Sequence, residues 1–278
     1  MPSDSDLRNA RARAITPLGL GTGETGVLLL HGYLATPEEM RGLAEHLAAA
    51  GLRAAVPLIA GHGTTLHEFR RTTWRDWYAS AESALAELQA ECTRAFVVGM
   101  SLGGLQALHL AAHHPELAGV VALAPAVVLY DGRRPWRRAS DLKLALLERM
   151  PWLARLYPGE SSDGTPHFLH ADLRDEAARR RHIYYGFNPT SGVVELLRYA
   201  RHLRPELERI RQPLLLLHSP LDNTVPLLSS QYVLAHVSSR DKALDTQTAA
   251  RSWHVLTEDV DAPAVFAMVL RFIAERIR

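Results

Sequence analysis

The segment that most constrains the fold spans residues 95–104, where a short apolar run leads into Gly99-Met100-Ser101-Leu102-Gly103 and a helical pattern follows at once. A strand, a serine and a helix in this order are typical of a sharp turn that holds the serine hydroxyl at the edge of a sheet. Gly99 and Gly103 have no side chains, so the helix can fold back closely over the strand. The sequence therefore predicts a reactive serine at Ser101. The alternative is an ordinary strand-to-helix turn that contains a serine.

Length and composition indicate one large α/β domain. The chain has 278 residues, of which 47% are hydrophobic and 22% charged, as in soluble globular proteins. The net charge of +1 does not point to nucleic acid or an anionic membrane as a partner. Cys92 is the only cysteine, which excludes an internal disulfide and a cysteine-rich zinc site. Residues 1–14 lack the apolar core of a secretory signal, and no apolar run is long enough to span a bilayer. We therefore expect a cytoplasmic protein without stable membrane insertion.

Short apolar runs alternate with helical patterns in the first half of the chain. The runs at 26–30, 52–58, 95–100 and 119–123 are predicted strands, and helical patterns stand between them. This alternation predicts a parallel sheet with right-handed crossovers. The first helix has clear start signals: Thr36 as N-cap, Pro37 at the first helical position, and Glu39 completing a capping box.

The alternation is interrupted between residues 127 and 211. This range holds helical patterns, at 141–149 and 191–204, but no convincing strand. Structureless loops of this length are rare in compact domains. We therefore predict a helical cap over 127–211, inserted into an α/β core of residues 1–126 and 212–278, with residues 1–14 as a loose tail.

Two further chemical groups follow predicted strands in the last part of the chain. Asp222 comes directly after the strand at 213–217, and His254 comes after a weaker strand at 243–249. A serine hydroxyl needs a histidine to take its proton and an acid to orient that histidine. Because open α/β sheets hold their sites at the carboxyl ends of the strands, Ser101, Asp222 and His254 are the predicted catalytic residues. Weaker rivals are Asp241, Asp245 and Asp259 for the acid, and His62, His113, His114 and His218 for the base.

Negative charge on a reacting carbonyl oxygen requires fixed N–H donors. The Leu102 N–H at the start of the predicted helix is one candidate donor. The loop after the first predicted strand is expected to supply the other donor. Because Gly32 lets the backbone of this loop approach closely, the Tyr33 N–H is the second candidate. A simple tight turn at His31-Gly32 is the alternative.

With these parts in place, the chain resembles the α/β-hydrolase superfamily, and within it the bacterial carboxylesterases and monoacylglycerol lipases. The resemblance implies a mostly parallel central sheet flanked by helices, a helical cap over an apolar pocket, and no metal or organic cofactor. It implies that an ester acylates Ser101, with His254 as general base and acid, Asp222 as orienting acid, and the backbone N–H groups of Tyr33 and Leu102 as the oxyanion hole. It covers residues 26–278 and rests on Leu30-His31-Gly32-Tyr33, Gly61-His62-Gly63, Gly99-Met100-Ser101-Leu102-Gly103-Gly104, Asp222-x-x-Val225-Pro226 and His254-Val255-Leu256-Thr257-x-Asp259.

The chain departs from the family pattern at two positions near the expected site. Trp253 precedes the histidine where the family often has glycine, and His218 also occupies a place where glycine is common. The Trp253 side chain suggests a narrower site mouth, whereas the sequence gives no account of His218.

The expected substrate is a small-molecule carboxylic ester with a short- to medium-chain acyl group, and monoacylglycerols are one candidate. The alternatives are carbon–carbon, thioester or amide hydrolysis, or a non-catalytic ligand receptor on the same fold. Basic clusters at 133–138 and 179–181 fit a solvated face and leave peripheral contact with lipid open; the oligomeric state is not predicted. The residues predicted to line the substrate pocket are His31, Leu142, Leu146, Met150, Trp152 and Val225. The alternative for those in the cap is that they only pack the cap onto the core.

Overall fold

A computed structural model describes residues 14–129, 146, 149–150, 160–161, 172–182 and 187–277 of the chain. None of the described helices combines the length and the apolar character that crossing a bilayer requires. The strands are β1 (Leu18–Leu20), β2 (Thr25–Leu30), β3 (Arg53–Val56), β4 (Arg94–Met100), β5 (Gly119–Leu123), β6 (Glu160–Ser161), β7 (Phe187–Asn188), β8 (Leu214–Leu217) and β9 (Lys242–Asp245). The helices are α2 (Glu38–Ala49), α3 (Leu66–Phe69), α4 (Trp74–Glu91), α5 (Leu102–His113), α7 (Glu176–Arg181), α8 (Thr190–Leu203), α9 (Leu228–His236) and α10 (Ala262–Ala274), with the 3-10 helix η2 (Arg204–Arg209).

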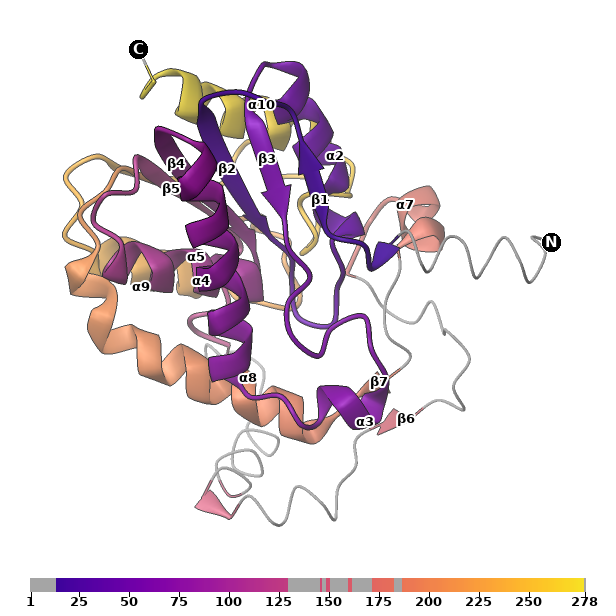
Figure 1. Cartoon of the computed structure of the whole chain (residues 1–278). Coiled ribbons are helices and arrows are strands. Elements are labelled where there is room, and N and C mark those ends of the chain that lie inside the picture. Colours follow the sequence, from indigo (N-terminus) through magenta and orange to yellow (C-terminus); the bar gives the residue numbers. More distant parts are fainter. Residues whose placement is uncertain are drawn as a thin grey trace.

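Seven of these strands form one sheet with helices on both faces, which confirms the predicted α/β class (Figure 1). The strand order is β1-β3-β2-β4-β5-β8-β9. Only β1 runs antiparallel, against β3, and every other neighbouring pair in this sheet is parallel. The order reverses at β2, because β3 lies on one side of it and β4 on the other. Sites of open α/β sheets form at such a reversal, beyond the carboxyl ends of the strands.

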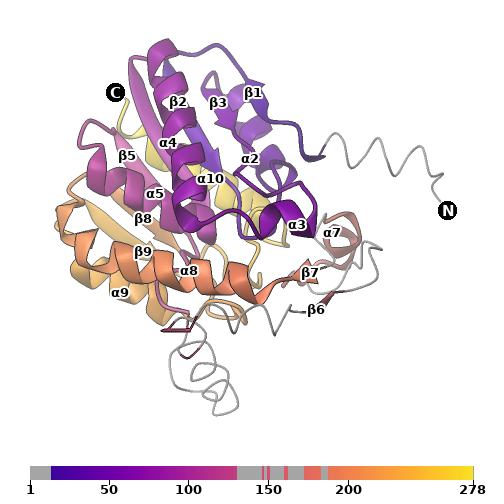
Figure 2. The same ribbon diagram turned by 60° about the horizontal axis from the view of Figure 1, so that its bottom comes forward.

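Alternate side chains of the central strands serve two separate cores. Leu28 of β2 and Val97 of β4 belong to the core under α4, α5, α8 and α9, whereas Leu29 and Val98 belong to the core under α2 and α10. Successive residues of a strand point to opposite faces, so a strand that is apolar throughout is buried on both sides. This explains why the predicted strands read as continuous apolar runs. The turned view in Figure 2 shows α8 and α9 on the side of the sheet that also carries α4 and α5.

The predicted capping box at the start of α2 is wrong. The helix begins at Glu38 after Pro37, and no side chain caps it. The carboxylate of Glu39 instead accepts a hydrogen bond of 2.6 Å from the backbone N–H of Gly32. The acceptor that local spacing assigned to the helix is thus used by the loop that follows β2.

Only part of the predicted cap range falls in the described residues. The helix expected at 191–204 is confirmed as α8, while most of the helical pattern at 141–149 lies outside the described residues. The two-residue strands β6 and β7 form an antiparallel pair that was not expected, because two residues are too short to carry a recognisable pattern. The cap boundaries at 127 and 211 stay a prediction.

The turn between β4 and α5 depends on glycine at two positions. Ser101 has a φ of +56°, a conformation that costs a non-glycine residue energy. A Cβ atom at Gly99 would lie 2.0 Å from the carbonyl oxygen of Gly103, and one at Gly103 would lie 2.0 Å from the carbonyl oxygen of Leu30. These backbone contacts are closer than any side chain permits, so both glycines are required for α5 to start where it does.

We predict that Gly103→Ala lowers the free energy of unfolding by about 2–3 kcal/mol or more, because α5 has to move away from β2. Gly19→Ala in β1 is the matched control, since a Cβ there meets nothing within 4 Å. Urea unfolding followed by circular dichroism measures both. Equal midpoints for the two variants would show that the close approach of α5 to β2 is not needed.

Candidate active site

The structure brings Ser101, His254 and Asp222 into one hydrogen-bonded chain. Ser101 stands between β4 and α5, Asp222 in the loop after β8, and His254 in the loop between β9 and α10. The Nε2 atom of His254 lies 2.9 Å from the Ser101 Oγ, and its Nδ1 lies 2.7 Å from Asp222 Oδ2. In this arrangement Nδ1–H donates to the carboxylate and Nε2 accepts the hydroxyl proton. A nucleophile, a base and an orienting acid require this geometry.

The carboxylate of Asp222 is held by four donors. Its Oδ1 accepts the backbone N–H groups of Thr224 and Val225, each at 2.8 Å, and its Oδ2 faces His254 and His218. Burial by itself would raise the pKa of this carboxyl, but the two histidines outweigh burial and hold the pKa of Asp222 below its ordinary value. Asp222 is therefore ionised at neutral pH.

His254 responds to the same pair in the opposite sense. Burial disfavours its charged form, but the Asp222 carboxylate outweighs burial and raises the pKa of His254 above its ordinary value. An imidazole in this setting accepts a proton from the serine more readily than an isolated buried histidine would.

The competing acids are engaged elsewhere. Asp241 pairs with Arg276, Asp245 accepts N–H and hydroxyl groups of its own turn, and Asp259 accepts the backbone N–H groups of Trp253, Arg174 and Asp175. Asp259 shapes the loop that carries His254, whereas Asp222 bonds to the imidazole itself.

His218 is a buried neighbour of the Asp222 carboxylate. Its side chain is fully buried, with Nδ1 at 2.8 Å from the Ser230 hydroxyl. Its Nε2 lies 3.1 Å from the Val225 carbonyl oxygen and 3.3 Å from Asp222 Oδ2. Because the Val225 carbonyl can only accept, Nε2 carries the proton and also faces the carboxylate. His218, which stands where the family often has glycine, is thus a hydrogen-bond partner of Asp222.

The loop after β2 presents a fixed peptide group beside Ser101. A Cβ at Gly32 would lie 3.6 Å from the Ser101 Cβ, so the backbone of this loop lies directly beside Ser101. The Gly32 carbonyl accepts hydrogen bonds from His31 Nδ1–H at 3.0 Å and from the Ala35 N–H at 3.2 Å. Because a trans peptide is planar, fixing this carbonyl also fixes the Tyr33 N–H, which points the opposite way. The Leu102 N–H opens α5, where helix N–H groups lack intrahelical acceptors.

Glu39 lies behind the same loop in a second, buried charge cluster. Burial raises the pKa of Glu39 to about 7, although the Gly32 N–H and the nearby His182 act to lower it. His182 follows α7, and its Nδ1 is hydrogen-bonded to Glu258 in the loop of His254. Burial opposes the charge on His182, but Glu258 and Glu39 outweigh burial and raise its pKa. Sequence reasoning missed this cluster, because its members are far apart in the chain.

The segment 172–182 bonds to both loops that carry catalytic candidates. The Asp172 carbonyl accepts the backbone N–H groups of His254 and Val255 at 2.9 and 3.3 Å. The Asp172 carboxylate accepts the Asn223 N–H and the Thr224 hydroxyl, next to Asp222. This part of the predicted cap range is therefore hydrogen-bonded to the site and supports it directly.

Four of the six predicted pocket residues lie in the part of the chain that the structure describes. His31 is fully buried, and its Nε2 accepts the Ile59 N–H at 3.2 Å, so both ring nitrogens hold backbone groups. Val225 is also buried and bonds to Asp222 through its N–H. Leu146 is 50% exposed and Met150 is half-buried, while Leu142 and Trp152 lie outside the described residues.

One family model and one relative above 30% identity show the family of the chain, and other known proteins are similar to it. Residues 23–261 match the family model described as serine aminopeptidase, S33. The thermostable monoacylglycerol lipase of Bacillus sp. (strain H-257) is 32% identical over 262 residues, which cover 93% of this chain and 94% of that protein. The carboxylesterase of Bacillus subtilis (strain 168) is 22% identical over 92% of this chain and 95% of its own length. A solved structure from work on the metagenome-derived lipolytic enzymes LipS and LipT has a TM-score of 0.81 at 27% identity, covering 94% of this chain and 98% of that one. The monoglyceride lipase of Saccharomyces cerevisiae shares the fold, with a TM-score of 0.75.

We predict that Asp222→Asn lowers the pKa of His254, because burial then acts on the imidazolium without its strongest opposing charge. The pKa is measured by NMR titration of the protein labelled in its histidine rings. Asp245→Asn, which changes a carboxylate of a separate turn, is the control and leaves the His254 titration in place. An unchanged His254 pKa in Asp222→Asn would mean that the carboxylate does not govern the base.

Proposed function

The chain belongs to the α/β-hydrolase family described as serine aminopeptidase, S33, and from this premise we propose that it hydrolyses carboxylic esters through an acyl-enzyme on Ser101. The observation that carries the proposal is the His254 ring, which bridges Ser101 and Asp222 at 2.9 and 2.7 Å. The lipase and esterase names of the relatives support the ester as the reacting bond.

In the first half of the proposed reaction, Ser101 Oγ attacks the ester carbonyl while His254 Nε2 takes the hydroxyl proton. The tetrahedral intermediate then collapses, the bond to the alcohol oxygen breaks, and His254 returns the proton to the leaving alcohol. Asp222 stabilises the imidazolium between these two events and stays ionised itself.

In the second half, water replaces the alcohol. His254 takes a proton from the water as its oxygen attacks the acyl carbonyl, and the proton then passes to Ser101 Oγ as the acid leaves. Each passage puts negative charge on the same carbonyl oxygen. We assign its stabilisation to the backbone N–H groups of Tyr33 and Leu102, which share the space beside Ser101.

We propose monoacylglycerols as the substrate class. The support is the relative named as a monoacylglycerol lipase, which aligns over nearly the full length of both chains. The predicted cap at 127–211 is the part of the chain that we expect to select the acyl group. The family description names an aminopeptidase, so amide hydrolysis is the second candidate and is part of the test below.

We predict that Ser101→Ala lowers kcat on esters by about 10⁴- to 10⁶-fold, as loss of the serine does in other enzymes with this triad. The measurement uses p-nitrophenyl esters from acetyl to palmitoyl, 1-monoacylglycerols with matching acyl groups, and amino-acid p-nitroanilides. Ser83→Ala on the exposed face of α4 is the control. Faster turnover of anilides than of esters would favour the amide reading, and full ester turnover by Ser101→Ala would refute the nucleophile.

We also predict that Glu39→Ala lowers kcat by about 10- to 100-fold with a smaller change in KM, because the Gly32 N–H loses its acceptor and the loop that carries the Tyr33 N–H is held less firmly. Glu38→Ala, whose carboxylate pairs with Arg41 on the same helix, is the matched control. A change in KM alone, with kcat as in the native enzyme, would contradict a role of Glu39 in the geometry of this loop.

A further inference from the structure

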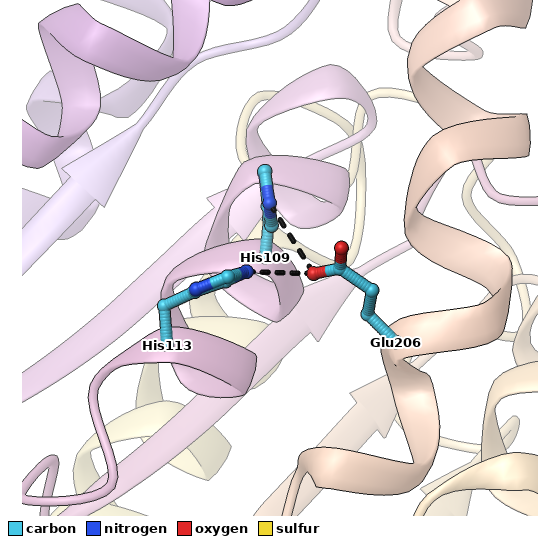
Figure 3. Close-up of side chains that lie close together, drawn as sticks. All are labelled: His109, His113 and Glu206. Carbon is cyan, nitrogen blue, oxygen red and sulfur yellow. Dashed lines mark hydrogen bonds and ion pairs between the residues drawn. The ribbon is translucent and has the colours of Figure 1, made fainter.

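A second cluster of ligand-type side chains lies at the other end of the helix that begins after Ser101. His109 and His113 are four residues apart on α5, which places them on one face of the helix. Both point at one carboxylate oxygen of Glu206 in η2 (Figure 3). One ligand atom from each of the three residues lies within 4.8 Å of the others. Sequence reasoning missed the cluster, since Glu206 is remote from α5 in the chain.

One of the two histidine–carboxylate distances already fits a metal site, and the other, a hydrogen bond, fits after a small movement. Ligand atoms of a tetrahedral zinc site stand about 3.3 Å apart when each is about 2.0 Å from the metal. The Nε2 of His109 is 3.6 Å from Glu206 Oε2, which is too long for a hydrogen bond and close to the spacing across a metal. The Nε2 of His113 is 2.6 Å from the same oxygen, so exposed His113 would move outward by less than 1 Å on binding.

The buried ligand is already oriented by a second hydrogen bond. His109 Nδ1 lies 3.1 Å from the Tyr199 hydroxyl, which leaves Nε2 directed at Glu206. The His109 ring also packs against Tyr78, with ring centroids 3.9 Å apart. Histidines that bind metals usually have their other ring nitrogen held in this way, because the bond fixes the tautomer and the ring plane.

A fourth donor stands within reach on the neighbouring helix. His202 of α8 is four residues before Glu206, and its Nε2 lies 3.5 Å from Glu206 Oε1. Two pairs of residues with a spacing of four thus face each other across the contact between α5 and the α8–η2 segment. Three imidazoles and one carboxylate are a donor set that suits Zn²⁺, whereas Mg²⁺ and Ca²⁺ prefer oxygen.

We propose that His109, His113 and Glu206 bind a zinc ion, with His202 or water in the fourth position. The ion would link the last turn of α5 to η2. His109 is seven residues beyond Leu102, about 10 Å along the helix axis, so the zinc does not touch the reacting ester. The site is a structural clamp, and it does not depend on the proposed reaction at Ser101.

The test is zinc binding by the untagged chain after treatment with a chelator. Isothermal titration is expected to show one Zn²⁺ per chain, and Co²⁺ in its place is expected to give the intense visible bands of a tetrahedral site. The midpoint of thermal unfolding rises by about 5 °C when free zinc is a hundredfold above its Kd. Mg²⁺ is the control ion and leaves the midpoint unchanged.

Two variants locate the site. His113→Gln and Glu206→Gln are expected to weaken zinc binding at least tenfold and to abolish the cobalt bands, while keeping the fold by circular dichroism. His236→Gln, an exposed histidine of α9, is the matched control and binds as the native chain does. The proposal is overturned if no zinc binds at a ratio of one per chain, or if binding survives unchanged in His113→Gln and Glu206→Gln. The cluster would then be only a hydrogen-bonded contact between α5 and η2.

Discussion

The contact on which the rest of the site depends is the one between α5 and the end of β2. Gly103 lies so close to the Leu30 carbonyl that even a methyl group has no room, and this contact sets where α5 begins. It places the first N–H of the helix, the Ser101 hydroxyl and the loop at Gly32 in one small space. The positive φ of Ser101 is the local energetic cost of that arrangement. The hydrogen bond between His254 and Ser101 depends on these backbone contacts, because they fix the position of the Ser101 hydroxyl.

Around this fixed point, the polar groups are arranged so that few of their hydrogen-bonding positions remain open. Asp222 receives two backbone donors and two histidines, and both backbone groups of Gly32 are held, its N–H by Glu39 and its carbonyl by His31. Groups held in this way need little reorganisation when charge develops on a substrate. The same design explains why His31, His218 and Glu39 are buried although none of them contacts the Ser101 hydroxyl.

The sequence was sufficient to predict which side chains at the ends of strands lie together. Ser101, Asp222 and His254 each come after an apolar run, and this position together with chain order selected them from many serines, aspartates and histidines. It was insufficient wherever one residue has two plausible partners. Glu39 fits a local capping box, yet its carboxylate bonds to Gly32, and only three-dimensional proximity decides between them. The same limit applies to Glu206, whose histidine neighbours on α5 lie about a hundred positions earlier.

The hydrogen bonds of Asp172 and His182 limit how freely residues 172–182 can be exchanged between relatives. The loop of His254 takes a backbone acceptor from Asp172, and Glu258 on that loop takes its partner from His182. A chimaera that received residues 172–182 from a relative would need a backbone that places the carbonyl of residue 172 in the same position, and a cation at the place of His182. Without them, the backbone N–H groups of His254 and Val255 would lose their acceptor, and the Glu258 carboxylate would lose the His182 imidazole. Exchanging this segment therefore also alters the hydrogen bonds that support the loop of His254.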